Sequence, residues 1–149
     1  MRAVILNKYN KEGNVEIKEI PIPEVGKNDV LVKIKYAGVN PLDNMIIREE
    51  VKFIVPYDLP LIMGNEFSGV IEKIGNNVTE FKIGDKVYGR MPLKKIGAFA
   101  EYISIDKEAI AIFPDYLSFK EAACITLTAL TAMQAFDLME AKSGERIFI

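Results

Sequence analysis

The sequence contains no histidine and a single cysteine, Cys124. Without histidine it lacks the commonest metal ligand, the side chain that titrates nearest neutrality, and the base of Ser-His and Cys-His nucleophiles. One cysteine excludes an intramolecular disulfide and a Cys-based zinc cluster, and it is typical of a reducing compartment. Several common classes of hydrolase and zinc protein are therefore excluded.

The sequence also lacks an excess of one charge and a long apolar run. Its 19 basic and 21 acidic residues give a net charge of −2, and the pI is ≈ 5.3. This balance argues against a nucleic-acid partner, which would need a basic face. No apolar run approaches the ~20 residues of a membrane span, and the apolar N-terminal run is too short for a signal peptide. We expect a cytoplasmic protein with no nucleic-acid or membrane partner.

What is present fits one globular unit. The 149 residues are 50% apolar and 27% charged, without internal repeats or a linker. A chain of this size buries roughly 70% of the surface exposed by the unfolded chain. It can therefore form a core without disulfides or a structural metal.

Apolar residues in the first three quarters of the chain alternate in the period-two manner of short strands. Glycine and proline separate six or seven of these segments, and residues 29–39 form the strongest of them, which we expect to be central in its sheet or nearly so. This pattern predicts a closed or partly closed β-barrel, which hides sheet edges. The predicted strands are residues 2–6, 15–20, 29–39, 67–74, 86–89, 98–105 and 109–113, with a loop at 51–63.

Two helices are predicted from their N-terminal signals. Asn40 as N-cap and Pro41 at the first helical position predict a short helix that ends near residue 48. A capping box from Ser118 to Glu121 predicts a long helix that runs to about residue 141. The second helix is apolar on every side, so we expect it to be covered on more than one face. Residues 145–149 are predicted to begin another strand.

Six ordered motifs cover almost the whole chain, and together they are specific although each alone is weak. They resemble the N-terminal, GroES-like catalytic domain of the medium-chain alcohol dehydrogenase and quinone oxidoreductase superfamily. The motifs are residues 37–43 (AGVNPLD), 64–71 (GNEFSGVI), 81–89 (FKIGDKVYG), 97–102 (GAFAEY), 114–123 (PDYLSFKEAA) and 130–132 (LTA).

The resemblance implies a mainly β fold with helices: a GroES-like, partly closed barrel at residues 1–120. Residues 121–149 are then a connecting helix and the first strand of a truncated Rossmann domain. In this family a glycine-rich turn that binds the dinucleotide pyrophosphate follows such a strand. The sequence contains no Gly-x-Gly-x-x-Gly. We therefore expect NADP or NAD to be bound mainly by residues outside this sequence, and the isolated chain to be inactive.

The zinc branch of the family holds its metal with two Cys and one His. Those positions match Asn40, Asn65 and, at about the second Cys position, Leu127. The resemblance therefore implies the zinc-free branch, the quinone and enoyl reductase types, with no zinc. Glu66, which follows the lost His position, is expected either to line the substrate site or to be a structural hydrogen-bond acceptor.

Reduction of an enone or quinone develops negative charge on oxygen, which hydrogen-bond donors in a dry pocket can stabilise. By resemblance, Asn40 and Asp43 lie beside the nicotinamide, and the NH2 of Asn40 is the candidate donor. The alternative is that Asn40 is only an N-cap. Thr131 resembles a threonine that contacts the nicotinamide carboxamide, or it bonds its own helix carbonyl.

Arg48 and Tyr57 flank the loop that covers the substrate in this family. Tyr57 is a candidate proton donor, or it packs against the core. The candidate catalytic residues are thus Asn40, Asp43 and Tyr57, and the substrate-lining ones Arg48, Tyr57 and Glu66. The partner is a small-molecule substrate, and a homodimer of a full-length protein is compatible with the resemblance. The other class of function left open is a non-catalytic β-barrel interaction module, because co-chaperonins share this small barrel.

Overall fold

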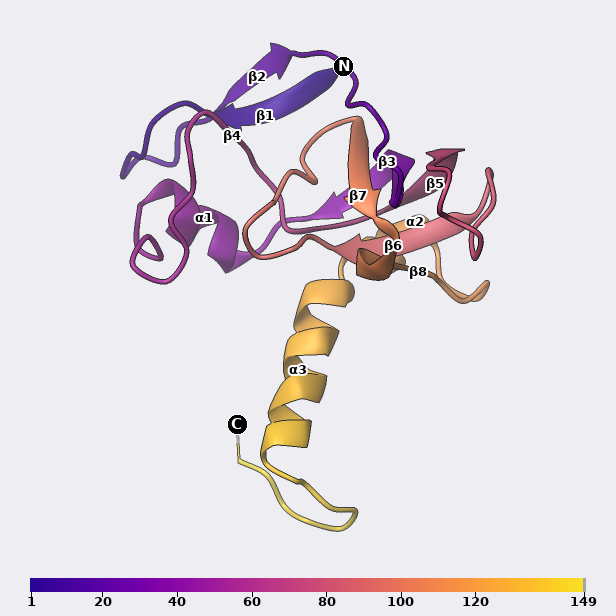
Figure 1. Cartoon of the computed structure of the whole chain (residues 1–149). Helices are drawn as coiled ribbons and strands as arrows, with labels where there is room; N and C mark the ends of the chain where they lie inside the picture. The colour runs from indigo at the N-terminus through magenta and orange to yellow at the C-terminus, as the bar shows by residue number, and fades with distance from the viewer. Residues whose placement is uncertain (149) are drawn as a thin grey trace.

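Two antiparallel sheets form the body of the protein in a computed structural model that describes residues 1–148 (Figure 1). The smaller sheet has the order β2-β1-β4, and the larger has the order β7-β3-β5-β6-β8. The strands are β1 Arg2–Leu6, β2 Glu16–Glu19, β3 Asp29–Gly38, β4 Leu61–Ile62, β5 Glu66–Ile74, β6 Lys86–Arg90, β7 Tyr102–Asp106 and β8 Ile110–Ile112. The mainly β prediction is confirmed, and β3 is an interior strand as expected.

The two sheets do not close into a single barrel within the described residues. They are joined where residues 98–101, predicted to be the first half of a strand, run from one sheet to the other. Only Ala100 there forms a bridge, to Ala3. The N–H of Phe99 instead donates to Met63 O (2.7 Å), and the N–H of Val4 donates to Phe99 O (2.8 Å). This segment forms no continuous ladder because its backbone is shared between two partners.

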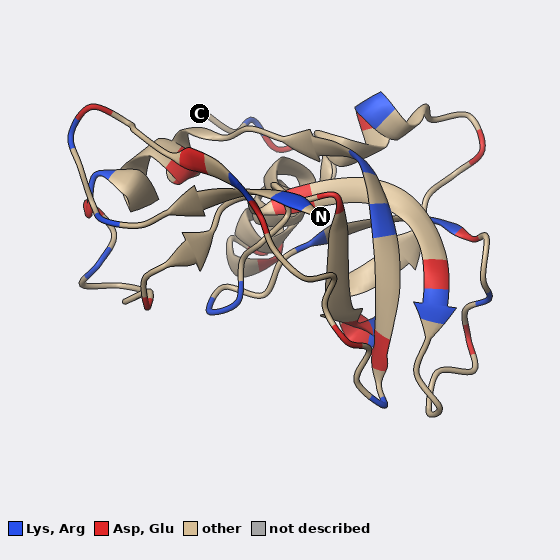
Figure 2. Ribbon diagram, turned by 90° about the horizontal axis from the view of Figure 1, so that it is seen from above, with Lys and Arg blue, Asp and Glu red and all other residues tan. Residues whose placement is uncertain are grey.

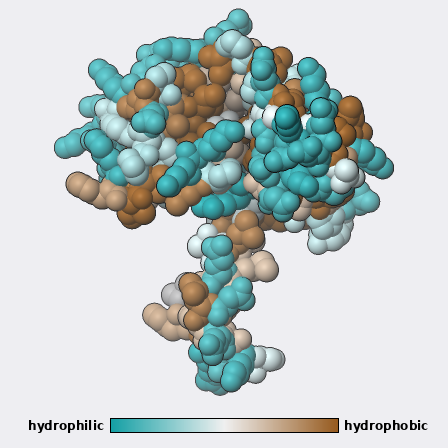
Figure 3. Space-filling view, in the orientation of Figure 1, coloured by the Kyte–Doolittle hydropathy of each residue, from teal (hydrophilic) through white to brown (hydrophobic). Residues whose placement is uncertain are grey.

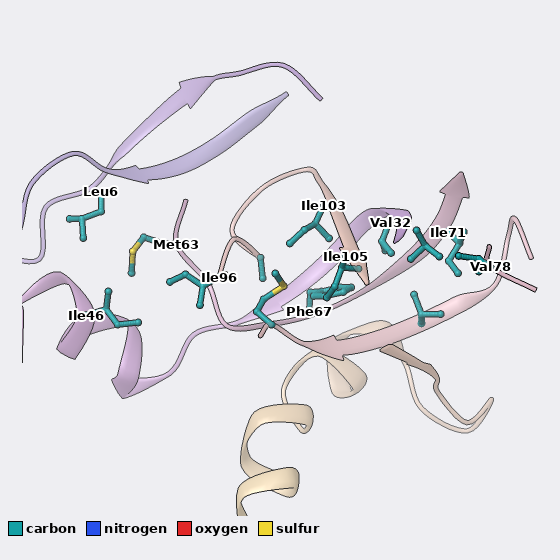
Figure 4. Packing of buried hydrophobic residues seen from close by; sticks show 14 of the residues in the cluster. Leu6, Val32, Ile46, Met63, Phe67, Ile71, Val78, Ile96, Ile103 and Ile105 are labelled. Atoms are coloured by element: carbon teal, nitrogen blue, oxygen red, sulfur yellow. The ribbon is translucent and has the colours of Figure 1, made fainter. Parts of the chain in front are cut away.

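A continuous apolar core lies between the larger sheet and the segments that cover it (Figure 4). Phe67 on β5 is fully buried at its centre, and Ile46 of α1 extends the core toward the smaller sheet. Alternate β3 side chains contribute Val30 and Val32, as the period-two pattern predicts, but Leu31 on the other face is buried too. The core thus fixes α1 (Pro41–Ile47) against the sheets.

The prediction of one continuous helix from Ser118 to about residue 141 is wrong. The structure has α2 (Phe119–Ala123), then a turn at Cys124 and Ile125, then α3 (Thr126–Leu138). The predicted capping box at Ser118 is present. The helix is interrupted because buried groups outside it bind the first turn of α3, as described below.

Helix α3 projects away from the two sheets (Figure 1). Apolar side chains remain exposed along it, among them Leu130, Met133 and Phe136 (Figure 3). The expected cover on more than one face is not supplied by the described residues. Residues 145–148 form no strand, because no neighbouring strand in this part of the chain pairs with them, and Ile149 of that prediction lies outside the described residues.

Basic and acidic positions are interspersed along the ribbon, and neither sign gathers in one part of the fold (Figure 2). Within residues 1–148, no helix has the length and apolar character needed to cross a membrane.

Candidate functional site

The N-terminus of α1 is closed by backbone and side-chain bonds between Asn40 and Asp43. The N–H of Asp43 donates to the Asn40 carbonyl (3.0 Å), and the N–H of Asn40 donates to Asp43 Oδ2 (2.7 Å). The predicted cap position of Asn40 is therefore correct, and Asn40 and Asp43 have the arrangement of a capping box. The amide of Asn40 is left for another partner.

Asp43 is buried and also binds β5. Asn65 Nδ2 donates to Asp43 Oδ1 at 2.8 Å, so both carboxylate oxygens are used. Burial raises the pKa of Asp43, the bonds from Asn40 and Asn65 oppose this shift, and the nearby charge of Glu66 adds to it. Loss of water is the dominant cause, since it disfavours the charged form.

Glu66, on β5, is 1% exposed and receives three hydrogen bonds. Asn40 Nδ2 donates to Oε1 (2.8 Å). The hydroxyl of Thr126 (2.9 Å) and the backbone N–H of Leu127 (2.7 Å) both donate to Oε2. A buried carboxylate is stable only when its oxygens are satisfied in this way. One side chain therefore joins the start of α1 to the start of α3.

This carboxylate explains the break between α2 and α3. The N–H groups of a first helical turn have no partner within the helix, and a negative charge near them is favourable. Glu66 supplies both the acceptor and the charge for Leu127. A new helix therefore begins at Thr126 although the sequence contains no Gly or Pro there.

The space around the carboxylate is filled. A Cβ added at Gly38 would lie 2.5 Å from Glu66 Oε1 and 2.8 Å from the carbonyl oxygen of Ala123. Glycine at this position lets β3 approach both groups. The position of the Glu66 side chain is thus set by packing as well as by hydrogen bonds.

A cavity of about 650 Å³ lies between the N-terminus of α1 and one face of α3. It brings together the two predicted cofactor contacts, Asn40 and Thr131. The hydroxyl of Thr131 donates to the carbonyl of Leu127 at 2.7 Å, so its oxygen is free to accept. The other lining residues are mostly apolar: Pro41, Leu42, Leu127, Thr128, Ala132, Ala135, Phe136, Met139, Ile147 and Phe148.

The other predicted site residues do not line this cavity. Glu66 is buried behind Asn40, where it is the hydrogen-bond acceptor described above. Tyr57 is half-buried against the core, and its hydroxyl donates to Leu93 O at 2.8 Å. Burial raises the pKa of Tyr57. Arg48 is exposed just past the end of α1. Substrate-contacting roles for these three residues stay predictions.

The positions matched to the zinc ligands do converge. Asn40 and Leu127 bind Glu66, and Asn65 binds Asp43, all within one hydrogen-bonded cluster. Across residues 1–148, no group of three or more His, Cys, Asp and Glu side chains is arranged to hold a metal. The donors of the cluster are used within the protein.

A second cavity, of about 490 Å³, lies along another face of α3. Its walls come from β6, β8 and the α3 residues Ala129, Leu130 and Met133. None of the predicted site residues lines it, so the cavity that contains Asn40 and Thr131 is the better candidate site.

Sequence reasoning missed Thr126 and the pairing of Asp43 with Asn65. No local signal indicated Thr126, because the N-cap of α3 is Ile125 and Thr126 is followed by a run of mostly apolar residues. The Asp43–Asn65 bond joins residues 22 positions apart, and no local pattern indicates it.

The two sheets, the capped α1 and the projecting α3 define a GroES-like domain. The profile of the alcohol dehydrogenase GroES-like domain matches residues 26–115, so the chain belongs to this family. The same family was predicted from the six motifs, and the prediction is confirmed.

The chain is similar to several proteins that are named as oxidoreductases. The chain is 36% identical over 139 residues to the mitochondrial NAD(P)H oxidoreductase RTN4IP1 of Dictyostelium discoideum, covering 91% of this chain and 40% of that protein. It is 32% identical to the 2-methylene-furan-3-one reductase of Solanum lycopersicum, covering 95% and 39%. The quinone oxidoreductase structure from Coxiella burnetii superposes with a TM-score of 0.85 at 30% identity, covering 97% of this chain and 47% of that one. The chain thus spans less than half the length of these relatives, whose names favour an oxidoreductase over an interaction module.

Proposed function

We propose that this chain is the catalytic domain of a zinc-independent, NAD(P)H-dependent reductase of quinones or enones. The observation that carries the proposal is that Asn40 and Thr131, from the start of α1 and the middle of α3, line one cavity. The names of the relatives, an NAD(P)H oxidoreductase and a reductase of a conjugated furanone, support the same chemistry.

The cavity fits the nicotinamide end of the cofactor. A nicotinamide ring is flat and largely apolar, and it carries one carboxamide. Pro41, Leu42 and Phe136 supply apolar walls, and Asn40 and Thr131 supply polar atoms for the carboxamide. Apolar walls with a few polar groups are typical of cofactor sites. When bound, NAD(P)H supplies a hydride to a carbon of the substrate.

The residues of the chain would bind the nicotinamide ring and orient it. The amide of Asn40 and the oxygen of Thr131 hold the carboxamide, and Pro41, Leu42 and Phe136 contact the apolar ring. Conjugated acceptors suit a site without a Lewis acid, because delocalisation spreads the developing negative charge and lowers the demand on protein donors.

The experiment is a chimera in which residues 1–149 replace the matching N-terminal part of the Coxiella burnetii quinone oxidoreductase. We expect NADPH-dependent reduction of a quinone or enone. Asn40→Ala and Thr131→Val each remove a polar contact to the carboxamide, so each should lower kcat/KM about tenfold.

Met133→Ala is the matched control, because this residue lies on α3 but lines the other cavity. Its turnover should stay within about twofold of the unmutated chimera. Unchanged turnover and cofactor affinity in both Asn40→Ala and Thr131→Val would contradict the site. Faster oxidation of simple alcohols than reduction of enones would contradict the reaction.

A further inference from the structure

We propose that the free edge of β2 is an interface between two copies of this chain, which pair antiparallel about a two-fold axis at Ile17. The proposal does not depend on the proposed function. In Figure 1, β2 lies at one end of the molecule and α3 projects from the opposite end. The pairing therefore leaves the cavity between α1 and α3 open.

The outer edge of β2 carries backbone groups without a partner. β2 is the end strand of the smaller sheet and pairs only with β1. Just beyond it, Ile20 exchanges two backbone hydrogen bonds with Met1, at 2.7 and 2.8 Å. Because backbone groups alternate between the two edges of a strand, the even-numbered residues face β1 and the odd-numbered residues face outward. Among residues 1–148, the outward groups form no hydrogen bond; they belong to Val15, Ile17 and Glu19. Such an edge can accept another strand.

The charges of β2 are complementary to their own reversed order. Glu16 and Lys18 lie on one face of the strand, with Lys18 Nζ 3.0 Å from Glu16 Oε2. When two copies run antiparallel with Ile17 opposite Ile17, Glu16 of each copy lies opposite Lys18 of the other. Opposite charges at opposed positions stabilise a strand pair. The same register joins the outward backbone groups of Ile17 to each other, and those of Val15 to those of Glu19.

The neighbouring symmetric registers are disfavoured. A shift of the two-fold axis by one residue places Glu16 opposite Glu16, or Lys18 opposite Lys18. Like charges at opposed positions destabilise a strand pair. The charge pattern therefore favours one register and one partner, a second copy of the same strand.

Ile17 adds an apolar contact to the pairing. Its side chain is 74% exposed, whereas β-branched residues in sheets are typically half-buried. In the proposed register the Ile17 side chains of the two copies lie on the same face and cover each other. The interface is small, so we expect a reversible dimer with a dissociation constant on the order of 100 μM.

Charge reversal tests the register. Glu16→Lys and Lys18→Glu each place like charges at both opposed positions, so each variant should self-associate about tenfold more weakly in sedimentation equilibrium. A mixture of the two variants should associate like the unmutated chain, because every opposed pair then has opposite signs. A chain with both substitutions keeps the original net charge, and it should also recover self-association. A recovery of this kind cannot result from misfolding of the single variants.

Glu72→Lys is the matched control. It makes the same change of net charge as Glu16→Lys, at a partly exposed ion pair with Lys33 on the larger sheet. Its self-association should equal that of the unmutated chain. An equal loss in Glu72→Lys and Glu16→Lys would show that net charge alone governs the association.

NMR of the ¹⁵N-labelled chain locates the interface. As the protein concentration rises, the amide signals of Val15, Ile17 and Glu19 should shift and exchange more slowly with solvent, while the signals of α3 should not shift. The proposal is overturned by a monomer at concentrations up to about 1 mM, or by a mixture of variants that associates no better than each alone. Concentration-dependent shifts confined to α3 would also overturn it, because they would place the contact on the exposed apolar face of that helix.

Discussion

Asn40 donates its side-chain amide to Glu66 at 2.8 Å, across 26 positions of the sequence. The same carboxylate binds Leu127 at the start of α3. One buried carboxylate therefore fixes the start of α1 and the start of α3, the two walls of the candidate site, relative to each other. Loss of that charge should affect stability and ligand binding together.

Replacement of Glu66 by alanine should destabilise the fold strongly. It leaves the part-buried donors of Asn40 and Leu127 without their acceptor, and Thr126 keeps only its longer bond to the carbonyl of Gly89 at 3.3 Å. A buried donor left without its acceptor costs about 1–3 kcal/mol, so the loss at this site should clearly exceed about 1 kcal/mol. Urea denaturation of the purified chain measures the change.

Glu72→Ala is the control for that measurement. Glu72 lies on the same strand, but its side chain is 40% exposed in its ion pair with Lys33. Its removal should change the free energy of unfolding by less than about 1 kcal/mol. Equal losses in the two variants would contradict the role assigned to Glu66.

The ionisation of Asp43 should make the free energy of unfolding depend on pH. Its pKa is raised by burial above 3.8, so the folded protein holds this proton at pH values where the unfolded chain has lost it. The folded state then binds more protons, and the free energy of unfolding falls as the pH rises through that interval.

The measurement is urea denaturation at a series of pH values from 3 to 7, on the unmutated chain and on Asp43→Asn. Subtraction of the two curves removes the contribution of the other carboxylates. Glu80 is one of them: its pKa is lowered to about 2, mainly by its bond with Lys107. A lowered pKa makes the free energy of unfolding rise with pH, which is opposite to the effect expected of Asp43. The stability of the unmutated chain relative to Asp43→Asn should decrease with rising pH. A relative increase would show that Asp43 is ionised more easily in the folded state.

The purified chain should contain no stoichiometric zinc. The polar groups at the matched ligand positions, Asn40 and Asn65, are already bonded to Glu66 and Asp43, and Leu127 carries no ligand atom in its side chain. Neutral amides are poor replacements for thiolate and imidazole in a zinc site. Elemental analysis after dialysis against a chelator tests this, and retained zinc at one ion per chain would refute the match of positions.

The isolated chain should bind intact NADPH weakly. In the proposed function the cavity of about 650 Å³ would receive only one end of the cofactor, and no glycine-rich pyrophosphate turn occurs in the sequence. We expect an affinity in the millimolar range, about −4 kcal/mol, by titration calorimetry. Micromolar binding would mean that these residues form a complete dinucleotide site.

Local patterns predicted the strands well, because alternation and glycine or proline punctuation are properties of neighbouring residues. Strand β1 at residues 2–6 is confirmed without change, and β3 begins at Asp29 as expected. The cap at Asn40 was also predictable from its own sequence. These elements depend little on distant contacts.

The break before α3 was not predictable in this way. Residues 122–138 contain neither Gly nor Pro, and every local signal favours one continuous helix. The acceptor that starts a new helix at Thr126 comes from Glu66, 60 positions earlier. For the same reason the sequence suggested a free amide at Asn40, whereas the fold supplies it with a buried partner.

A substitution at Gly38 would change the candidate site through steric contact alone. Any larger residue there would press on Glu66 and on the backbone of Ala123, without altering a charge or a hydrogen-bonding group. Variation at this one position on β3 would therefore tilt the amide of Asn40 and the first turn of α3 together. Side-chain size at Gly38 is therefore the property to vary if the ligand preference of the site is to be changed while every polar side chain is kept.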